Sequence, residues 1–330
     1  MLNFFAALSS AWPRHGAASF LELEADGAVA GAALQPIDHA GSAELRRWVS
    51  AIKGEGPGMR CAREEEGRRI CRSEAACAVE SPPVAETMWR TCETAARPVS
   101  AAVGSSSGCL VVSVGIGGEW AFEDALVKAG CEVHAFDPTS DLRASHEAHA
   151  RAGDATKLHF HYVGLGAGAN YTASNHSNSY GALSSEFLPL DALIATAKRG
   201  RDVPLTILKV DCEGCEWDAF ADAARRAPHA LDDVSMLMLE LHLTERLGMR
   251  DAASLSTLMR HVVGDHRFRL SRQHTNHGFA VDWNAARPEL VRAGWEAHPC
   301  CAELHFVRAP DGAEQAAERE RGGVAQARGE

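Results

Sequence analysis

Apolar and polar positions alternate in a regular order along residues 109–308. Short apolar runs predict buried strands, and most of the stretches between them carry apolar residues at helical spacing. The predicted strands are residues 109–114, 131–137, 157–166, 205–211, 234–243, 268–274 and 301–309. Strands that alternate with helices form a parallel sheet with helices on both faces. No helix separates the last two strands, so we expect them to pair antiparallel.

The pattern therefore predicts an α/β fold with a seven-stranded, mostly parallel, Rossmann-like sheet and an antiparallel last strand. Residues 1–87 form an N-terminal extension that contains Ala, Gly and Cys and is partly helical, at 42–53. Residues 88–308 form the main domain. Residues 309–330 are polar and charged, and we expect this tail to be disordered.

The composition argues against some classes of binding partner but does not determine the cellular compartment. The 330 residues carry a net charge of −11, which argues against nucleic acid as a partner. No apolar run reaches the roughly 18 residues that a membrane span needs. The N-terminus has a short apolar stretch without a basic region before it, which makes a poor signal peptide. We expect a soluble protein of the cytoplasm or of a secretory lumen.

Cysteines and histidines give no clear metal pattern. Cys61, Cys71, Cys77 and Cys92 precede the first core strand, and either disulfides or reduced thiols would explain them. A bridge between Cys92 and Cys109 is one prediction, and the Cys212–Cys215 spacing is interpreted as incidental. Two pairs, His146 with His149 and His159 with His161, lack a third ligand at a matched spacing. We interpret them as exposed or hydrogen-bonded histidines.

The sequence "VVSVGIGGEW" (111–120) joins the first core strand to a helix through Gly115, Gly117 and Gly118. Asp137 follows the next strand, about twenty residues later, where a carboxylate can bind ribose hydroxyls. Trp120 stands where a dinucleotide fingerprint has its third glycine. This departure disfavours a pyrophosphate at the helix N-terminus, so we expect a nucleoside cofactor without phosphates.

Ionisable residues follow the fourth and fifth predicted strands. Asp211 and Glu213 end the strand in "LKVDCEGCEW", and Glu240 and His242 end the next one. In a parallel sheet these ends share one edge, so the four side chains are predicted catalytic residues.

The ordered motifs "VVSVGIGGEW", "VHAFDP", "HYVGLG", "LKVDCEG" and "MLELH" resemble those of FkbM-type methyltransferases and, more closely, the methyltransferase-like protein 24 group. The resemblance covers about residues 88–308. It implies a class I methyltransferase fold that uses S-adenosylmethionine. Gly115, Ile116 and Gly117 would line the methionine part, Asp137 the ribose, and Gly164 and Leu165 the adenine. Ser113 stands at the place of the usual first-loop acid, and Glu119 replaces a loop glycine.

The resemblance implies methyl transfer, and the acidic edge suits a hydroxyl acceptor on a small molecule or glycan. His242 is one candidate base, and Asp211 or Glu213 is another. Asp211, Glu213 and Glu240 would permit Mg²⁺, but no spacing demands it and we do not predict a metal. Two alternatives stay open: a catalytically degenerate, methyltransferase-like binding module, and an NAD-dependent dehydrogenase.

Overall fold

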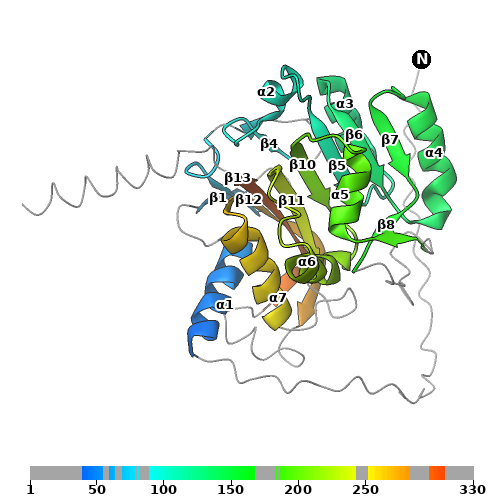
Figure 1. Cartoon of the computed structure of the whole chain (residues 1–330). Coiled ribbons are helices and arrows are strands. Elements are labelled where there is room, and N and C mark those ends of the chain that lie inside the picture. The colour runs from blue at the N-terminus through cyan, green and yellow to red at the C-terminus, as the bar shows by residue number, and fades with distance from the viewer. Residues whose placement is uncertain are drawn as a thin grey trace, which may run out of the picture. The chain divides into compact units, whose positions relative to one another are not determined.

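A computed structural model of the chain describes residues 39–54, 59–63, 69–78, 80–81, 89–167, 183, 186–242, 252–282 and 297–308 (Figure 1). All of these lie in one compact unit, residues 38–330. The tail predicted to be disordered, 309–330, lies outside the described residues, as does the apolar N-terminal stretch.

The main sheet has nine strands in the order β1-β2-β12-β13-β11-β10-β5-β6-β7. Their bounds are β1 Met59–Arg63, β2 Arg69–Ser73, β5 Leu110–Val114, β6 Glu132–Phe136, β7 Leu158–His161, β10 Leu205–Val210, β11 Val234–His242, β12 Phe268–Asp282 and β13 Ala297–Arg308. Strands β7, β6, β5, β10 and β11 run parallel, and β13 pairs antiparallel with both β11 and β12. The predicted antiparallel last strand is confirmed, and β5 is the middle one of the five parallel strands.

The structure corrects the predicted strand count of seven. The additional strands β1 and β2 come from the N-terminal extension, and β2 pairs with β12. Their sequences, MRCAR and RICRS, each carry two arginines three positions apart and lack the apolar runs of the core strands. The run 157–166 is also two elements. Its second part, β8 Gly164–Leu165, leaves the main sheet and pairs with β9 Phe187–Leu188.

Helices cover both faces of the main sheet (Figure 1). The core on one face includes residues of α1 His39–Ile52, α5 Leu190–Lys198, α6 Cys215–Arg226 and α7 Ala252–Met259. The core on the other face includes residues of α2 Val99–Val103 and α3 Ala121–Ala129. Helix α4, Arg143–Ala152, follows β6 and a 3-10 turn at Ser140–Leu142. A π-helical turn at Arg260–Asp265 continues α7, and a two-stranded ribbon pairs β3 Glu80–Ser81 with β4 Thr91–Cys92.

Disulfides join the described cysteines. The pairs are Cys61–Cys71, Cys77–Cys92, Cys109–Cys131 and Cys212–Cys215, and Cys301 is also disulfide-bonded. The predicted Cys92–Cys109 bridge is therefore wrong. Cys109 and Cys131 directly precede the neighbouring parallel strands β5 and β6, which brings their Cα atoms to 4.6 Å. The Cys212–Cys215 spacing is not incidental, because the two sulfurs are bonded.

Candidate functional site

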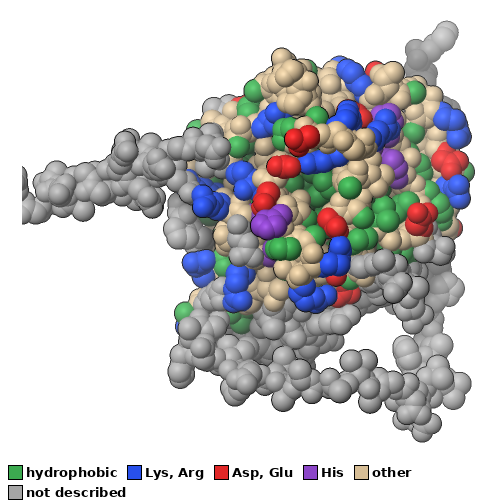
Figure 2. Space-filling view, in the orientation of Figure 1, with side chains coloured by type: hydrophobic (Ala, Val, Ile, Leu, Met, Phe, Trp, Pro, Cys, Tyr) green, Lys and Arg blue, Asp and Glu red, His purple; other side chains and the backbone are tan. Residues whose placement is uncertain are grey.

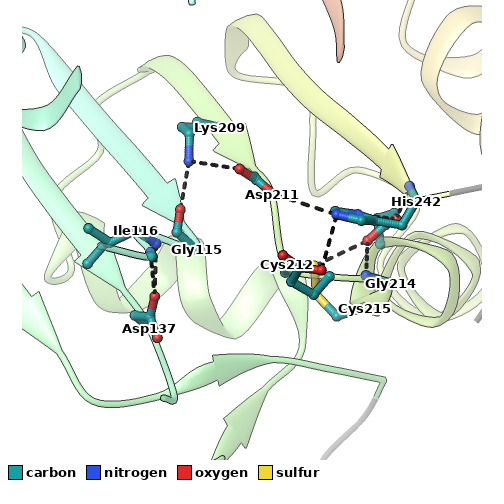
Figure 3. Close-up of polar contacts among 12 residues, drawn as sticks. Gly115, Ile116, Asp137, Lys209, Asp211, Cys212, Gly214, Cys215 and His242 are labelled. Atoms are coloured by element: carbon teal, nitrogen blue, oxygen red, sulfur yellow. Dashed lines mark hydrogen bonds and ion pairs between the residues drawn. A yellow bond between two sulfur atoms is a disulfide. The ribbon is translucent and has the colours of Figure 1, made fainter. Parts of the chain in front are cut away.

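The glycine loop after β5 requires glycine because it lies against the end of β10. Gly115 and Gly117 have φ angles of 78° and 62°, a left-handed region that favours glycine. A Cβ atom on Gly115 would lie 1.6 Å from the carbonyl oxygen of Asp211. Lys209 Nζ donates a hydrogen bond of 2.7 Å to the Gly115 carbonyl (Figure 3). The loop and the acidic end of β10 therefore form one continuous surface.

Asp137, after β6, shapes the loop from the other side. Its Oδ2 accepts hydrogen bonds from the backbone N–H groups of Ile116 (2.9 Å) and Gly117 (3.1 Å), and its Oδ1 accepts one from Thr139 (2.8 Å) (Figure 3). The side chain is buried. Because a carboxylate offers about four acceptor positions, these three bonds leave capacity for one more. The predicted contact with ribose stays a prediction.

Trp120 does not crowd the loop. The indole is buried, and its Nε1 donates a 3.1 Å hydrogen bond to His146 Nδ1 on α4. Its ring stacks on His149 with the ring centroids 4.6 Å apart. The side chain thus packs between α3 and α4. On the outer side of the loop, a Cβ atom on Gly118 would meet no atom within 4 Å, so this side is open.

Ser113 and Glu123 form a buried polar pair beneath the loop. Ser113 donates a 2.5 Å hydrogen bond to Glu123 Oε1, and both side chains are buried. Burial raises the pKa of Glu123, although Lys209 and Ser113 act in the opposite direction. The Ser113 hydroxyl thus donates its hydrogen bond to a side chain of α3. Glu123, three residues before the buried Leu126 on α3, therefore places a buried carboxylate beside Ser113, and this helical spacing was the sequence signal for it.

Gly164 and Leu165 lie near the loop that follows Asp137. A Cβ atom on Gly164 would lie 2.3 Å from Phe187 Cε1 and 3.1 Å from Pro138 Cβ. Leu165 packs into the hydrophobic core. Their predicted position beside the adenine is a proposal that this placement permits.

Three of the predicted catalytic residues, Asp211, Glu213 and Glu240, lie around the fourth, His242. Its Nε2 lies 3.9 Å from Asp211 Oδ1 and 3.6 Å from Glu213 Oε2 (Figure 3). Glu240 precedes His242 by two residues on β11 and lies on the same face of the strand. A Glu240 carboxylate oxygen lies within 4.8 Å of a His242 ring nitrogen. The sequence argument therefore brought together residues that do share this edge.

Sequence reasoning missed Glu216, which holds His242 in place. Glu216 Oε1 accepts bonds from the His242 backbone N–H (2.7 Å) and lies 3.1 Å from His242 Nδ1. Trp217 Nε1 also donates to the His242 carbonyl at 2.9 Å. Helix α6 therefore fixes both the backbone and the ring at the end of β11.

The charge of His242 follows from this environment. Burial alone would lower the pKa of His242, but Glu216, Glu240 and Asp211 together raise it to about 10. An imidazole with that pKa is a cation at neutral pH and does not accept a proton. Asp211 and Glu213, which are about one-quarter exposed, are then the better candidate bases.

The turn between β10 and α6 is tightly constrained. Glu213 and Gly214 both have positive φ angles, 58° and 103°, and the Cys212–Cys215 disulfide closes the turn. Glu216 Oε2 accepts a 3.0 Å hydrogen bond from the Gly214 N–H.

In the described residues, none of the three groups of potential metal ligands includes Asp211 or Glu213.

Comparison with known proteins agrees with this arrangement. Residues 92–246 match a family model described as a methyltransferase domain. The matched stretch contains the glycine loop, Asp137 and the acidic cluster around His242. The comparison with curated proteins gave no match.

Two solved structures share a general likeness. One is Sp1610 of Streptococcus pneumoniae, whose proposed activity is tRNA (m1A22) methylation. It is 11% identical in sequence and gives a TM-score of 0.32, and the match covers 63% of this chain and 68% of Sp1610. The other is the mitomycin 7-O-methyltransferase MmcR, 13% identical, with 64% and 52% covered and a TM-score of 0.29. At these identities and TM-scores, the two structures do not indicate the substrate of this chain.

None of the helices in the described part of the chain combines the length and the apolar character that crossing a bilayer requires.

Proposed function

We propose that this chain transfers a methyl group from S-adenosylmethionine to a hydroxyl oxygen of a small molecule or glycan. The observation that carries the proposal is the contact between the glycine loop and the acidic cluster. Gly115 touches Asp211, and Asp211 faces His242. A cofactor held along the loop would thus place its reactive end beside the carboxylates, at the carboxyl edge where ligands of such sheets bind.

The loop fits S-adenosylmethionine in two respects. Its outer side is open at Gly118, and Asp137 has acceptor capacity for a ribose hydroxyl. Ile116 and Gly117 would lie along the methionine part, while Gly164 would border the adenine. When bound, S-adenosylmethionine supplies an electrophilic methyl group on a sulfonium.

The chain's own residues would orient the acceptor and take its proton. Asp211 or Glu213 would accept the proton of the acceptor hydroxyl, while S-adenosylmethionine, when bound, would supply the methyl group for the acceptor oxygen and leave as S-adenosylhomocysteine. Cationic His242 lies near both carboxylates and stabilises their negative charge. Lys209 Nζ, 3.8 Å from Asp211 Oδ2, fixes that side chain beside the loop. Among the described residues, the site holds four carboxylates (Asp211, Glu213, Glu216 and Glu240) and two cations (Lys209 and His242), and this net negative charge suits a neutral hydroxyl acceptor better than a carboxylate acceptor.

The disulfides bear on where this reaction takes place. All the described cysteines are bonded, and such bonds persist in oxidising compartments. Of the two compartments that the sequence left open, we propose the secretory lumen.

Turnover of substituted proteins tests the activity. We expect Asp211→Asn to reduce S-adenosylhomocysteine formation at least tenfold with a pool of hydroxylated acceptors, while S-adenosylmethionine still binds. Asp141→Asn, an exposed acid before α4, is the matched control and should leave the rate unchanged. Wild-type rates for both Asp211→Asn and Glu213→Gln would contradict the placement of the active site. Cofactor binding without transfer to any acceptor would favour a binding module.

A further inference from the structure

A second group of ionisable side chains lies at the other end of the sheet. Glu132 and His134 are two residues apart on β6, and His159 of β7 is the register partner of His134. All three therefore lie on one face of the sheet, where Phe136 joins the core that includes α5. Histidine side chains reach the surface in the region of β6 and β7 (Figure 2).

The ligand atoms of these three residues converge. His134 Nε2 lies 3.1 Å and His159 Nε2 lies 3.7 Å from Glu132 Oε1, and all three atoms lie within 4.8 Å of one another. Ligands at the usual Zn²⁺ bond lengths of about 2.05 Å are about 3.4 Å apart in a tetrahedron. The two measured separations lie on either side of that value, so an ion fits with small side-chain movements.

His159 points to an absent ligand. Its Nε2 is buried and has no hydrogen-bond partner, and 3.7 Å is too long for a bond to Glu132. A buried polar atom without a partner destabilises the folded protein unless another group satisfies it. A metal ion coordinated by the Nε2 lone pair would remove that destabilisation.

The surrounding residues suit metal ligation. His134 Nε2 lies 3.1 Å from Glu132 Oε1 and donates to it when no ion is bound. His134 Nδ1 lies 3.0 Å from His161 Nε2, so His161 can accept the ring proton at Nδ1 when an ion takes the place of the Nε2 proton. Arg201 holds Glu132 through both carboxylate oxygens, at 2.8 and 2.9 Å, which fixes the orientation of that ligand. Arg199 and Arg201 add positive charge nearby, which limits the affinity.

The described residues form two other groups of three potential ligands, and both differ from this one in a decisive way. Each contains cysteine, Cys212 with Cys215 in one and Cys301 in the other. These cysteines are disulfide-bonded and have no thiolate to offer. Within the described part of the chain, the group on β6 and β7 is thus the one made only of side chains that keep a lone pair for an ion, although Glu132 Oε1 also accepts hydrogen bonds from Arg201 and His134.

We propose that Glu132, His134 and His159 bind one Zn²⁺ ion, with the fourth position open to water. Two imidazoles and one carboxylate suit Zn²⁺, whereas Mg²⁺ and Ca²⁺ prefer oxygen ligands alone. Glu132 begins β6 and Asp137 follows its end, five residues or about 16 Å away along the strand. The ion therefore does not take part in methyl transfer. It joins β7, the edge strand of the sheet, to β6.

The test is calorimetric titration of the full chain with ZnCl₂ after dialysis against EDTA. We expect one ion per chain, and a visible absorption band of tetrahedral Co²⁺ when Co²⁺ replaces Zn²⁺. His159→Ala and Glu132→Gln should each weaken binding at least tenfold. His229→Ala removes an exposed histidine far from the group in sequence and should bind like wild type.

Two results would overturn the proposal: no Zn²⁺ binding by the wild type, or wild-type affinity in both His159→Ala and Glu132→Gln. Binding of S-adenosylmethionine is measured in parallel as a check on folding. His159 is partly exposed, so its replacement leaves most of the core intact.

Discussion

The cation at His242 can be tested by removing the charge that creates it. Glu216→Gln keeps the size and an acceptor oxygen of the side chain but removes its negative charge. Glu216 is fully buried and is the group that both hydrogen-bonds to the His242 ring and contributes most to raising its pKa. We therefore expect the variant to return the pKa of His242 toward its ordinary value of 6.5.

The magnitude follows from linkage between protonation and folding. The pKa of His242 is raised from 6.5 to about 10, so the protonated ring stabilises the folded state. This stabilisation is fully present below pH 6.5 and is lost as the pH rises through 10. At pH 7 a shift of this size corresponds to on the order of 4 kcal/mol, of which Glu216 should supply about half or more. Glu216→Gln should thus lose on the order of 2–3 kcal/mol of stability at pH 7.

Two measurements decide the outcome. Urea unfolding of wild type and variant between pH 6 and pH 10 should show a free energy of unfolding that falls with pH in the wild type and falls much less in Glu216→Gln. Histidine NMR spectra, assigned with a His242→Asn variant, report the titration of the ring directly. If His242 titrates near pH 6.5 in the wild type, or if both proteins show the same pH dependence, the reasoning is refuted and His242 returns as a candidate base.

Two further predictions concern the cofactor loop. Asp137→Ala should weaken S-adenosylmethionine binding by about 1–3 kcal/mol, measured by calorimetry, through loss of charge-assisted hydrogen bonds; unchanged affinity would contradict the role of Asp137. Gly115→Ala should abolish detectable cofactor binding, because its Cβ atom would overlap the Asp211 carbonyl. Gly104→Ala, at the end of α2 and outside the loop, is its control, because an added Cβ atom there meets nothing closer than 3.9 Å. Equal binding by the two variants would show that the loop tolerates the change.

The order of strands and helices was predictable because the central strands are buried on both faces. Runs such as 205–210 and 234–242 are almost continuously apolar, and their ends then locate the acidic cluster. Strands β1 and β2 were not predictable in the same way. The pairing of β2 with β12 depends on residues about 200 positions later, and the charged sequences of β1 and β2 show no core face.

The sequence predicted which residues lie at the site but not their protonation states. Positions at strand ends identify Asp211 and His242, yet the state of His242 depends on Glu216, which a helix turns inward. Similarly, Ser113, Glu123 and Lys209 form a buried group only when β5, α3 and β10 are packed together. Disulfide connectivity has the same limit, because spacing alone does not determine which cysteines meet.

The strands of the N-terminal extension set a practical limit on dividing this protein. The methyltransferase-domain match begins at residue 92, which suggests a convenient place to truncate the chain. Removing the extension would expose the backbone N–H and C=O groups of β12 that now pair with β2, and would uncover the apolar surface under Trp48 and Ile52 of α1. Bare strand edges and apolar patches promote aggregation. A shortened protein prepared for crystallisation or assay should therefore begin before α1.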